Sequence, residues 1–536
     1  MAASQPFSVP LKGGLNKSIN SMELLQTPGM ATKLLNFEVS TKGGYRRING
    51  YTLLGDGTRP NTTNAILGLQ VYADGVIAAS GTNIYFSQDG DSWLQINKTS
   101  VAAGGDNYST FTGRGALART SQSKAQFTIY EGNTSYGEVV ITDEGSGVKP
   151  FYFLMTGTGD LATRTFFAKE ITVSGTVYPK FCVIHNKHLV VAGAATALNT
   201  IYYSGTSDID DFTSSGSGSI VLDDQVVGLK SFRDELFIFC KNSIYKLQNI
   251  NNASTIAVVP VTQNIGCVDG KTIQEFAGDL IFLAPDGFRT IAGTARIGDI
   301  ELGTVSKQIQ PIINALVAGT ATEYSSVVLR DKSQYRMYYS ATSASTTASK
   351  GIIGTLTEEG FQWSQVEGIQ APAVTSGFNY SNKEKIYHGD RDGYVYNHDV
   401  GNTFNPGGSS VNVSAEYQSP DFDYGDFGTL KTLDYVKVSL FPEGSVSPTL
   451  RVRFDYDDPA RTQPQDLIVL ATTPSIFGDI LSIFGTSKFG SPEQPLVKST
   501  LVGSGYSNFF KIFSSDSNAP YTINGLYVNY RPSGRN

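Results

Sequence analysis

Hydrophobic and polar residues alternate over short stretches along most of this chain, and tight turns separate the stretches. Apolar runs such as VIAAS, LVVAG, LFIFC and LIFLA are each followed by a turn and a second strand. Alternation over so few residues predicts β-strands rather than helices. The high content of Gly, Tyr and Phe agrees with this reading, because these residues favour turns and pleated strands. The fold class is therefore predicted to be all-β.

The strands recur in similar units from about residue 64 onward. Five units can be aligned by eye, beginning with AILGLQVYADGVIAASGTNIYFSQDGDSW, and two further segments fit less closely. Repeats of some tens of residues indicate propellers or solenoids. Short apolar strands with regular turns favour four-stranded blades around an axis. We predict a β-propeller over residues 55–402, with six blades favoured and seven possible.

The pattern changes after a linker rich in Gly, Ser, Asn and Pro at residues 403–410. Residues 411–536 contain longer alternating strands, such as VNVSAEY and TLRVRFDY, which predict sheets with one buried face and hence a C-terminal β-sandwich. An insertion at about 457–500 is too long for a hairpin, and its IFGDILSIFG portion is a candidate contact surface.

The first 54 residues resemble neither part. They contain two Gly-Gly breaks and several apolar anchors with little periodicity, so we expect an extended N-terminal arm, with the first strands, that lies along something else. Helix is scarce in the whole sequence. The one candidate, TVSKQIQPIINALVAG, is short and is expected to be broken at Pro311.

Composition limits the function classes. The net charge of −7 argues against a surface built to grip phosphates, although transient passage of DNA remains compatible with it. Three widely spaced cysteines, Cys182, Cys240 and Cys267, suit a reducing compartment and are expected to be buried. The start of the chain lacks the apolar run of a secretory signal, and no window has the ~18 apolar residues of a spanning helix. We expect no stable membrane insertion.

The stretch YFSQDGDSW resembles the Asp-box turn of propeller enzymes such as sialidases. Its key positions are Ser87, Asp89, Gly90 and Trp93, and IYYSGTSDIDDF resembles a degenerate second copy. In such a turn the carboxylate accepts backbone N–H bonds, the glycine adopts an unusual dihedral angle and the tryptophan packs beneath. These boxes lie on the blade periphery, so the motif predicts a structural turn rather than catalysis.

Other candidate chemistry is weaker. A sialidase needs three axial arginines and a Tyr–Glu pair, and a glycosidase needs two facing carboxylates, but nothing in the sequence selects them. The segment HGDRDGYVYNHD could offer His388, Asp390, Asp392 and His398 to a metal. Its Asp-Gly step instead favours a hairpin turn with two solvent-facing histidines. A nucleophile pair between Cys182 and His185 or His188 is conceivable, but Cys182 reads as buried. We predict no catalytic residue, no metal site and no cofactor.

Three regions resemble one family. The N-terminal PLKGGLNKSINSMELLQTPGMATKLLNFEVSTKGGYRRINGY, several propeller units and the C-terminal SSDSNAPYTINGLYVNYRPSGRN are similar to the tail nozzle (tail tubular, or hub) proteins of short-tailed bacteriophages. The N-terminal motif positions are Gly13, Gly14, Leu15, Asn16, Pro28, Gly29, Asn36, Gly43, Gly44, Arg46, Arg47, Gly50 and Tyr51. The resemblance spans nearly the whole chain, and its motifs are structural rather than catalytic.

The resemblance implies a structural protein of the virion tail, assembled in the host cytoplasm. It implies a ring, usually of six subunits, below the portal and adaptor, which extends the channel for double-stranded DNA and helps to retain and eject the genome. Implied partners are the adaptor and the tail fibre, spike or needle proteins. The candidate assembly contacts are Gly13, Gly14, Leu15, Asn16, Arg46, Arg47, Ile476, Phe477, Ile480, Leu481, Ile483 and Phe484.

Two alternatives remain open at this point. One is a sialidase-like propeller glycosidase that acts on host-surface glycans. The other is a propeller that binds a glycan or receptor without turnover, in which aromatic residues such as Tyr203, Tyr339 and Tyr394 would stack on sugars, although packing is the more ordinary use of such residues.

Overall fold

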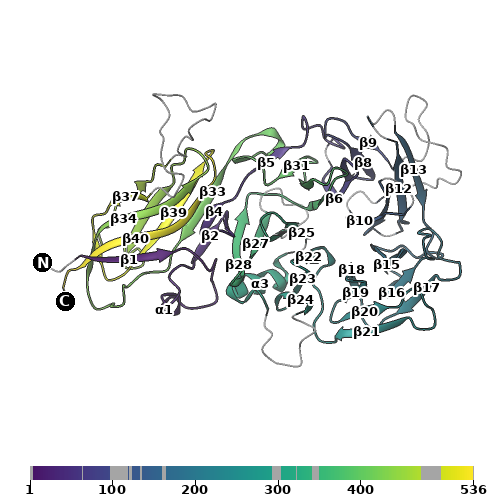
Figure 1. The fold of residues 1–536 in the computed structure, drawn as a ribbon, viewed down its shortest axis with the longest axis horizontal. Helices are drawn as coiled ribbons and strands as arrows, with labels where there is room; N and C mark the ends of the chain where they lie inside the picture. Colours follow the sequence, from purple (N-terminus) through teal and green to yellow (C-terminus); the bar gives the residue numbers. More distant parts are fainter. Residues whose placement is uncertain are drawn as a thin grey trace.

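The computed structural model describes residues 4–62, 64–96, 119, 123–132, 136–145, 147–157, 159, 164–292, 304–321, 323–340, 349–471 and 496–534. A ring of small sheets lies beside a pair of packed sheets (Figure 1). The all-β prediction is confirmed. Helical segments in the described part of the chain are short: α1 (Ser21–Leu24), η2 (Gly270–Thr272), η3 (Lys307–Ile309), α3 (Gln310–Ala315), η4 (Leu316–Thr320) and η5 (Pro406–Gly408).

The ring is a β-propeller whose blades follow one another in sequence. The first three blades consist of β6 (Ile66–Tyr72), β7 (Gly75–Ser80), β8 (Asn83–Ser87) and β9 (Leu94–Gln95); β10 (Ala125–Tyr130), β11 (Glu138–Asp143), β12 (Phe151–Thr156) and β13 (Thr165–Glu170); and β14 (Phe181–His185), β15 (His188–Ala194), β16 (Ala197–Tyr203) and β17 (Gly218–Val221). The fourth consists of β18 (Val226–Phe232), β19 (Glu235–Cys240), β20 (Ile244–Gln248) and β21 (Ala257–Thr262), and the fifth of β22 (Gln274–Phe276), β23 (Asp279–Ala284) and β24 (Gly287–Thr290). The last two consist of β25 (Glu323–Leu329), β26 (Gln334–Ser340), β27 (Lys350–Thr357) and β28 (Gly360–Glu367); and β29 (Ala373–Phe378), β30 (Glu384–Gly389), β31 (Val395–His398) and β5 (Tyr51–Leu53).

The first strand of each blade lies nearest the axis and contacts its counterpart in the next blade, or the turn η2 that leads into it, and β29 contacts β6 to close the circle. The described residues form seven blades. The fifth blade has three strands, and each of the other six has four. The predicted propeller of six or seven blades is thus confirmed. Strands β7 and β15 are buried at every position, which explains their continuous apolar sequences.

The N-terminal part of the chain completes the last blade. Strand β5 pairs antiparallel with β31, with Tyr51 opposite His398 and Leu53 opposite Tyr396. The two ends of the propeller sequence are therefore joined by backbone hydrogen bonds. A residue near position 52 belongs to the same blade as residues near 397, so the ring begins before residue 55.

The second body is a β-sandwich, as predicted. One sheet contains β3 (Phe37–Val39), β4 (Tyr45–Arg47), β40 (Tyr521–Pro532), β34 (Lys431–Pro442) and β37 (Leu496–Thr500), with β1 (Gln5–Pro10) and β38 (Ser504–Gly505) at its sides. The other contains β2 (Lys33–Leu35), β33 (Val411–Gln418), β39 (Asn508–Asp516), β35 (Thr449–Phe454) and β36 (Leu467–Ile468), with β32 (Thr403–Phe404) beside β33. Alternate residues of β34 point inward, and Val436, Val438 and Leu440 are fully buried.

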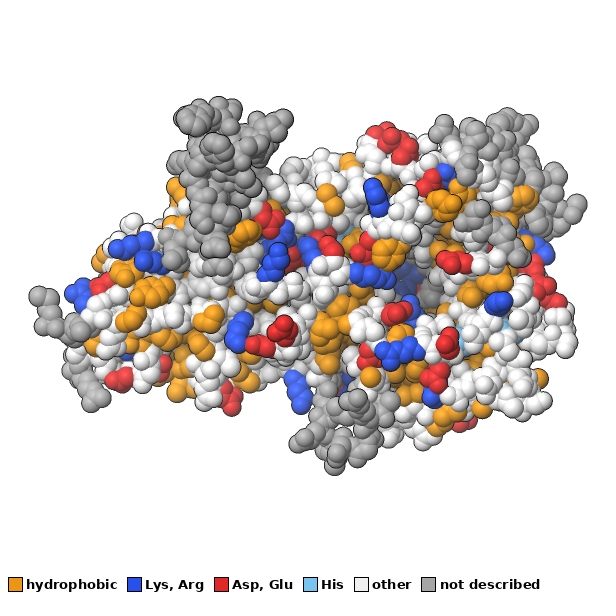
Figure 2. All heavy atoms as spheres, viewed as in Figure 1, with side chains coloured by type: hydrophobic (Ala, Val, Ile, Leu, Met, Phe, Trp, Pro, Cys, Tyr) orange, Lys and Arg blue, Asp and Glu red, His pale blue; other side chains and the backbone are white. Residues whose placement is uncertain are grey.

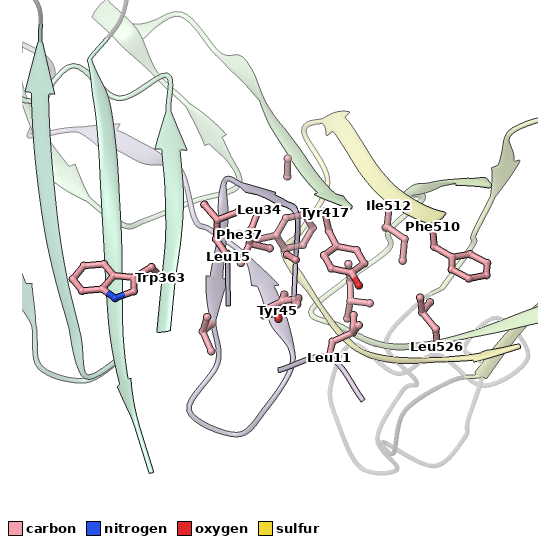
Figure 3. Packing of buried hydrophobic residues seen from close by; sticks show 14 of the residues in the cluster. Leu11, Leu15, Leu34, Phe37, Tyr45, Trp363, Tyr417, Phe510, Ile512 and Leu526 are labelled. Atoms are coloured by element: carbon pink, nitrogen blue, oxygen red, sulfur yellow. The ribbon is translucent and has the colours of Figure 1, made fainter. Parts of the chain in front are cut away.

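The extended N-terminal segment lies along its own chain, which corrects the expectation that it lies along something else. Strand β1 pairs with β40 over its whole length. Further along, the segment passes between blade six and the sandwich, where Leu15, Leu34 and Tyr45 pack between Trp363 on one side and Phe510 on the other (Figure 3). The N-terminal segment therefore fills the junction between the two bodies.

Strand β2 makes this junction continuous at the level of the backbone. Leu35 pairs in parallel with Gln365 of β28, and on its other side β2 pairs antiparallel with β33. Blade six and one sheet of the sandwich are consequently a single ten-stranded sheet. The three residues of β2 connect its two halves.

Two local predictions need correction. The predicted linker 403–410 is partly a hairpin, because Thr403 pairs with Asn412 and the buried Phe404 ring stacks on Tyr51 at 5.4 Å. In the predicted helix, Pro311 does not break the structure but lies in the first turn of α3. Proline is tolerated there because the first N–H groups of a helix have no internal partner.

A buried ionic network also crosses the junction. Glu38 of β3 accepts hydrogen bonds from Arg336 of β26 at 2.7 Å and from Arg46 at 2.8 Å. Asp399, which follows β31, binds Arg336 at 3.1 Å and Lys332 at 2.5 Å. Burial opposes ionisation of Asp399, but Arg336 and Lys332 outweigh it and lower the pKa of the carboxyl. The network ties blades six and seven to the sandwich.

Replacing Arg336 with methionine should destabilise the chain by about 3–5 kcal/mol, because it leaves Glu38 and Asp399 buried with fewer cations. Chemical denaturation followed by tryptophan fluorescence measures this. The matched control is Lys12→Met, which removes the exposed pair with Glu359 and should cost less than about 1 kcal/mol. Equal losses in the two variants would contradict the assigned role of the network.

Candidate functional site

The Asp-box-like turn follows β8 and is built from backbone hydrogen bonds. The buried Ser87 hydroxyl accepts the N–H of Gly90 at 2.8 Å, and Gly90 has the positive φ of 95° that favours glycine. Among the described residues, the exposed Asp89 accepts one hydrogen bond, from the N–H of Asp91 at 3.0 Å. Asp91 in turn accepts the N–H of Asp56 at 2.7 Å and so holds the segment after β5. The hydrogen bonds of the turn are therefore structural. Asp91 contributes more to them than Asp89 does, because it bonds to a second segment of the chain.

Trp93 and the second copy of the motif, IYYSGTSDIDDF, also form hydrogen bonds to the backbone. The half-buried Trp93 ring packs against the cluster around Leu54, and its indole N–H donates to the Thr58 carbonyl at 2.9 Å. In the second copy, the Ser204 hydroxyl accepts the N–H of Leu189 at 2.9 Å. The first motif therefore connects blade one to the segment after β5, whereas the second bonds to a strand of its own blade.

A cluster of charged side chains lies around the propeller axis at the end where the inner strands begin. Lys124, just before β10 of blade two, binds Glu323 at the start of β25 in blade six at 2.6 Å. Glu323 also binds Arg391 of blade seven, whose guanidinium donates to Ser340 at 2.7 Å. Blades two and six lie on opposite sides of the ring, so this ion pair crosses the axis.

A second set of ion pairs crosses the same axis. Lys271 of η2 in blade five binds Glu144 of blade two at 2.7 Å and lies 3.9 Å from Asp269. Burial opposes the charged form of Lys271, but Asp269 and Glu144 outweigh it and raise the pKa of the ammonium. Burial also raises the pKa of the Asp269 carboxyl, against the opposing influence of Lys271. Figure 2 shows such mixed charges around the hollowed middle of the propeller.

Sequence reasoning missed this axial cluster, because its residues lie in five separate segments. A signal was nevertheless available. Lys124, Lys271 and Glu323 each stand at the start of the inner strand of a blade or within three residues before it. Aligning the repeats on these strand starts would have placed three charged residues at one end of the axis.

The charged groups of the axial cluster form ion pairs between different blades. Glu144 and Asp269 are both within reach of one ammonium group, which holds them within about 6.6 Å of each other by the sum of the two distances above. That spacing is compatible with a glycosidase pair. However, the cation between the two carboxylates occupies the place that a reacting bond would need, and Glu323 is held by two further cations.

The histidine-containing segment 388–399 forms the predicted hairpin turn, but its histidines are not solvent-facing. His388 and His398 are 0% and 3% exposed, and their Nδ1 atoms are 3.1 Å apart. Burial lowers the pKa of both imidazoles. Asp390 accepts the N–H groups of Asp392 and Tyr394 and caps the turn. No group of metal-ligating side chains occurs among the described residues.

The remaining candidate residues are buried or half-buried. All three cysteines are buried, as predicted, and burial raises the pKa of each thiol to about 12. The tyrosines considered for sugar stacking are each half-buried, and Arg59 lies over the ring of Tyr394 at 4.8 Å. They are Tyr203, Tyr339 and Tyr394.

In the part of the chain that the structure describes, no helix is long and apolar enough to cross a membrane.

The candidate assembly residues fall into two sets. The first set lies inside the subunit: Gly13, Gly14, Leu15, Asn16 and Arg47 are buried, and Arg46 is 17% exposed. Gly14 shows why, since a Cβ atom there would lie 2.8 Å from the backbone of Trp363. The second set, Ile476, Phe477, Ile480, Leu481, Ile483 and Phe484, lies outside the described residues. A role in contacts between subunits stays a prediction for both sets.

Comparisons with known proteins add little. No family model matches the chain, and no curated protein matches it. Among solved structures, the chain is similar to an exo-β-1,3-galactanase from Phanerochaete chrysosporium with galactose, at 10% identity over 89% of this chain and 100% of that chain, with a TM-score of 0.27. It is also similar to the AfRom2 CNH domain, at 11% identity over 66% and 99% of the chains, with a TM-score of 0.35. Similarity at this level carries no argument about function.

Replacing Asp91 with alanine should lower the melting temperature more than replacing Asp89, since Asp91 holds a second segment of chain and Asp89 closes only its own turn. We expect a cost of about 1 kcal/mol for Asp91→Ala and less for Asp89→Ala. Differential scanning calorimetry of both variants tests the ranking. The reverse order would show that the turn, not the inter-segment bond, carries the stability.

Replacing Lys271 with methionine should cost about 2 kcal/mol at pH 8 and less at pH 5. Without the ammonium, which opposes the effect of burial, the pKa of the Asp269 carboxyl rises further above its ordinary value. Stability from such groups is present at low pH and is lost as pH rises through the folded pKa. Denaturation of wild type, Lys271→Met and the exposed control Lys241→Met at pH 5 to 8 measures the difference. A deficit that does not change with pH would contradict this account.

Proposed function

We propose that this chain is a structural subunit of the tail of a tailed bacteriophage. It would form a ring, with six copies expected, below the portal and adaptor, where it would extend the DNA channel and help to retain and eject the genome. The adaptor and the fibre, spike or needle proteins would be its neighbours. The proposal rests on the resemblance of the N-terminal and C-terminal segments to tail nozzle proteins.

The observation that best supports the proposal is where the resembling motifs lie. Gly14 lies against the backbone of Trp363, Gly44 against that of Ile523, and Gly50 so close to Thr403 that a Cβ atom would lie 1.8 Å from its carbonyl oxygen. Arg47 is fully buried and donates to the Asp516 carboxylate at 3.1 Å and to the Asn518 carbonyl. These motifs pack the N-terminal segment against blade six and into the sandwich, so the resemblance concerns the architecture of the subunit.

A rigid subunit suits a ring that bears load. The two bodies share one sheet and a buried ionic network, so force applied to one is passed to the other without a flexible linker. The axial ion pairs hold opposite blades together in the same way. A channel for DNA would then be formed between subunits rather than through one propeller.

The glycosidase alternative would use the axial carboxylates. In that case Asp269→Asn should abolish hydrolysis of a glycan substrate, whereas under the structural proposal no hydrolysis exists to lose. A screen of the full chain against polysaccharides, with Asp269→Asn as the matched inactive control, distinguishes the two. Turnover that depends on Asp269 would overturn the structural proposal.

Electron microscopy and light scattering of the purified full chain, alone and with the adaptor protein, test the ring. We expect closed rings with an open centre, either alone or once the adaptor is present. A particle that stays monomeric in both conditions would count against the proposal.

A further inference from the structure

The outer face of the sandwich sheet built on β34 and β40 has an unusual set of side chains. Because residues alternate along a strand, Val436 and Val528 point into the core and are fully buried. Their neighbours Tyr435, Lys437 and Tyr527 point outward. Lys437 pairs in register with Tyr527 of β40 on one side and with Lys498 of β37 on the other. We call Tyr435, Lys437, Lys498 and Tyr527 the Tyr–Lys face.

The two lysines are placed against electrostatic preference. Lys437 and Lys498 are directly opposite each other on neighbouring strands, where like charges destabilise a sheet. Neither lysine makes an ion pair with any described residue, whereas nearby Arg531 is paired with Asp434 at 2.6 Å. A lysine on an edge strand such as β37 can serve to prevent pairing with other sheets. That purpose does not account for Lys437, because β34 is paired on both sides.

Two tyrosine rings lie next to the lysine ammonium groups. The Tyr435 and Tyr527 rings are 6.5 Å apart at an interplanar angle of 23°. The Lys498 ammonium lies 4.4 Å from the centre of the Tyr435 ring, and the Lys437 ammonium lies 5.9 Å and 5.7 Å from Tyr435 and Tyr527. These contacts place the ammonium groups over the rings, and no carboxylate of the described residues pairs with either ammonium. The result is two adjacent positive charges beside two tyrosine rings, with no counter-ion among the described residues.

We propose that the Tyr–Lys face binds the phosphodiester backbone of DNA. Lysine ammonium groups are compact charges suited to phosphate oxygens, and phosphate contacts of this kind are independent of sequence. A bound polyanion would also remove the repulsion between the two lysines. The inference rests on the proposed function, since a tail ring would bring this acidic chain next to the genome, and it identifies a surface on which DNA would make contact.

Two lysines set a limit on the strength of binding. Each neutralised phosphate contributes about −0.9 to the slope of log K against log salt, so the Tyr–Lys face should give a slope of about −1.8 per subunit. Binding should therefore be weak and visible only at low salt. Weak contact is compatible with DNA that has to move, and the net charge of −7 keeps the rest of the surface unattractive.

Fluorescence anisotropy of the full chain with a labelled 20-base-pair duplex, at 25 to 200 mM salt, tests the proposal. The variant K437Q/K498Q removes both charges. The matched control K241Q/K383Q removes two exposed lysines of the propeller that make no ion pair with a described residue. We expect salt-dependent binding in the wild type and the control, and about tenfold weaker binding with a slope near zero in K437Q/K498Q. Circular dichroism checks that all variants fold.

Three results would overturn the proposal: no binding by the wild type at 25 mM salt, an equal loss in the control, or an unchanged slope in K437Q/K498Q. Electron microscopy of the same variants separates this inference from the ring itself. Rings that form normally in K437Q/K498Q while DNA binding is lost support the inference. If the wild type binds no DNA and K437Q/K498Q fails to form rings, the Tyr–Lys face would instead be assigned to contacts between subunits.

Discussion

The backbone hydrogen bonds on the two sides of β2 are the constraint on which the rest of this structure depends. A propeller and a sandwich could each form separately and be joined by a flexible segment. Here three residues, Lys33 to Leu35, pair with β33 on one side and meet β28 on the other, so neither body can rotate without breaking main-chain bonds. Backbone groups at a buried position have no water as an alternative partner, which makes such a connection costly to open.

The position of β2 explains why the buried charges at the junction can pair. Glu38 follows β2 by only three residues, and its carboxylate reaches Arg336 in blade six because the shared sheet fixes their separation. Breaking up such a group leaves unpaired buried charge, so the network gives the junction one allowed arrangement rather than simply more stability. The axial ion pairs act similarly for the ring, since Lys124 and Glu323 can meet only when blades two and six hold their places.

The sequence predicted those features whose cause is local. Strands such as β7 and β15 were visible because burial on both faces demands continuous apolar runs, and β34 was visible because one buried face demands alternation. Strands β2 and β5 were not, because three residues carry no period and their partners lie more than 300 residues away. The burial of His388 and His398 was missed for the same reason, as their cover comes from Tyr51 and Tyr338.

Among the candidate sites, residues that pack inside the subunit are easier to recognise from the sequence than residues that would contact another molecule. The residues that carry the family resemblance, such as Gly14 and Arg47, are explained by close packing within one subunit, and that is the property that a glycine or a buried arginine can reveal in a sequence. A surface for another molecule has no such signature, because its residues need only to be exposed and to lack partners. Lys437 and Lys498 are 61 positions apart and ordinary in composition, and only the register of β34 with β37 shows that their charges face each other. In a chain of net charge −7, a positive pair on two neighbouring strands that meets no carboxylate among the described residues is therefore a more specific pointer to a partner than any of the conspicuous motifs.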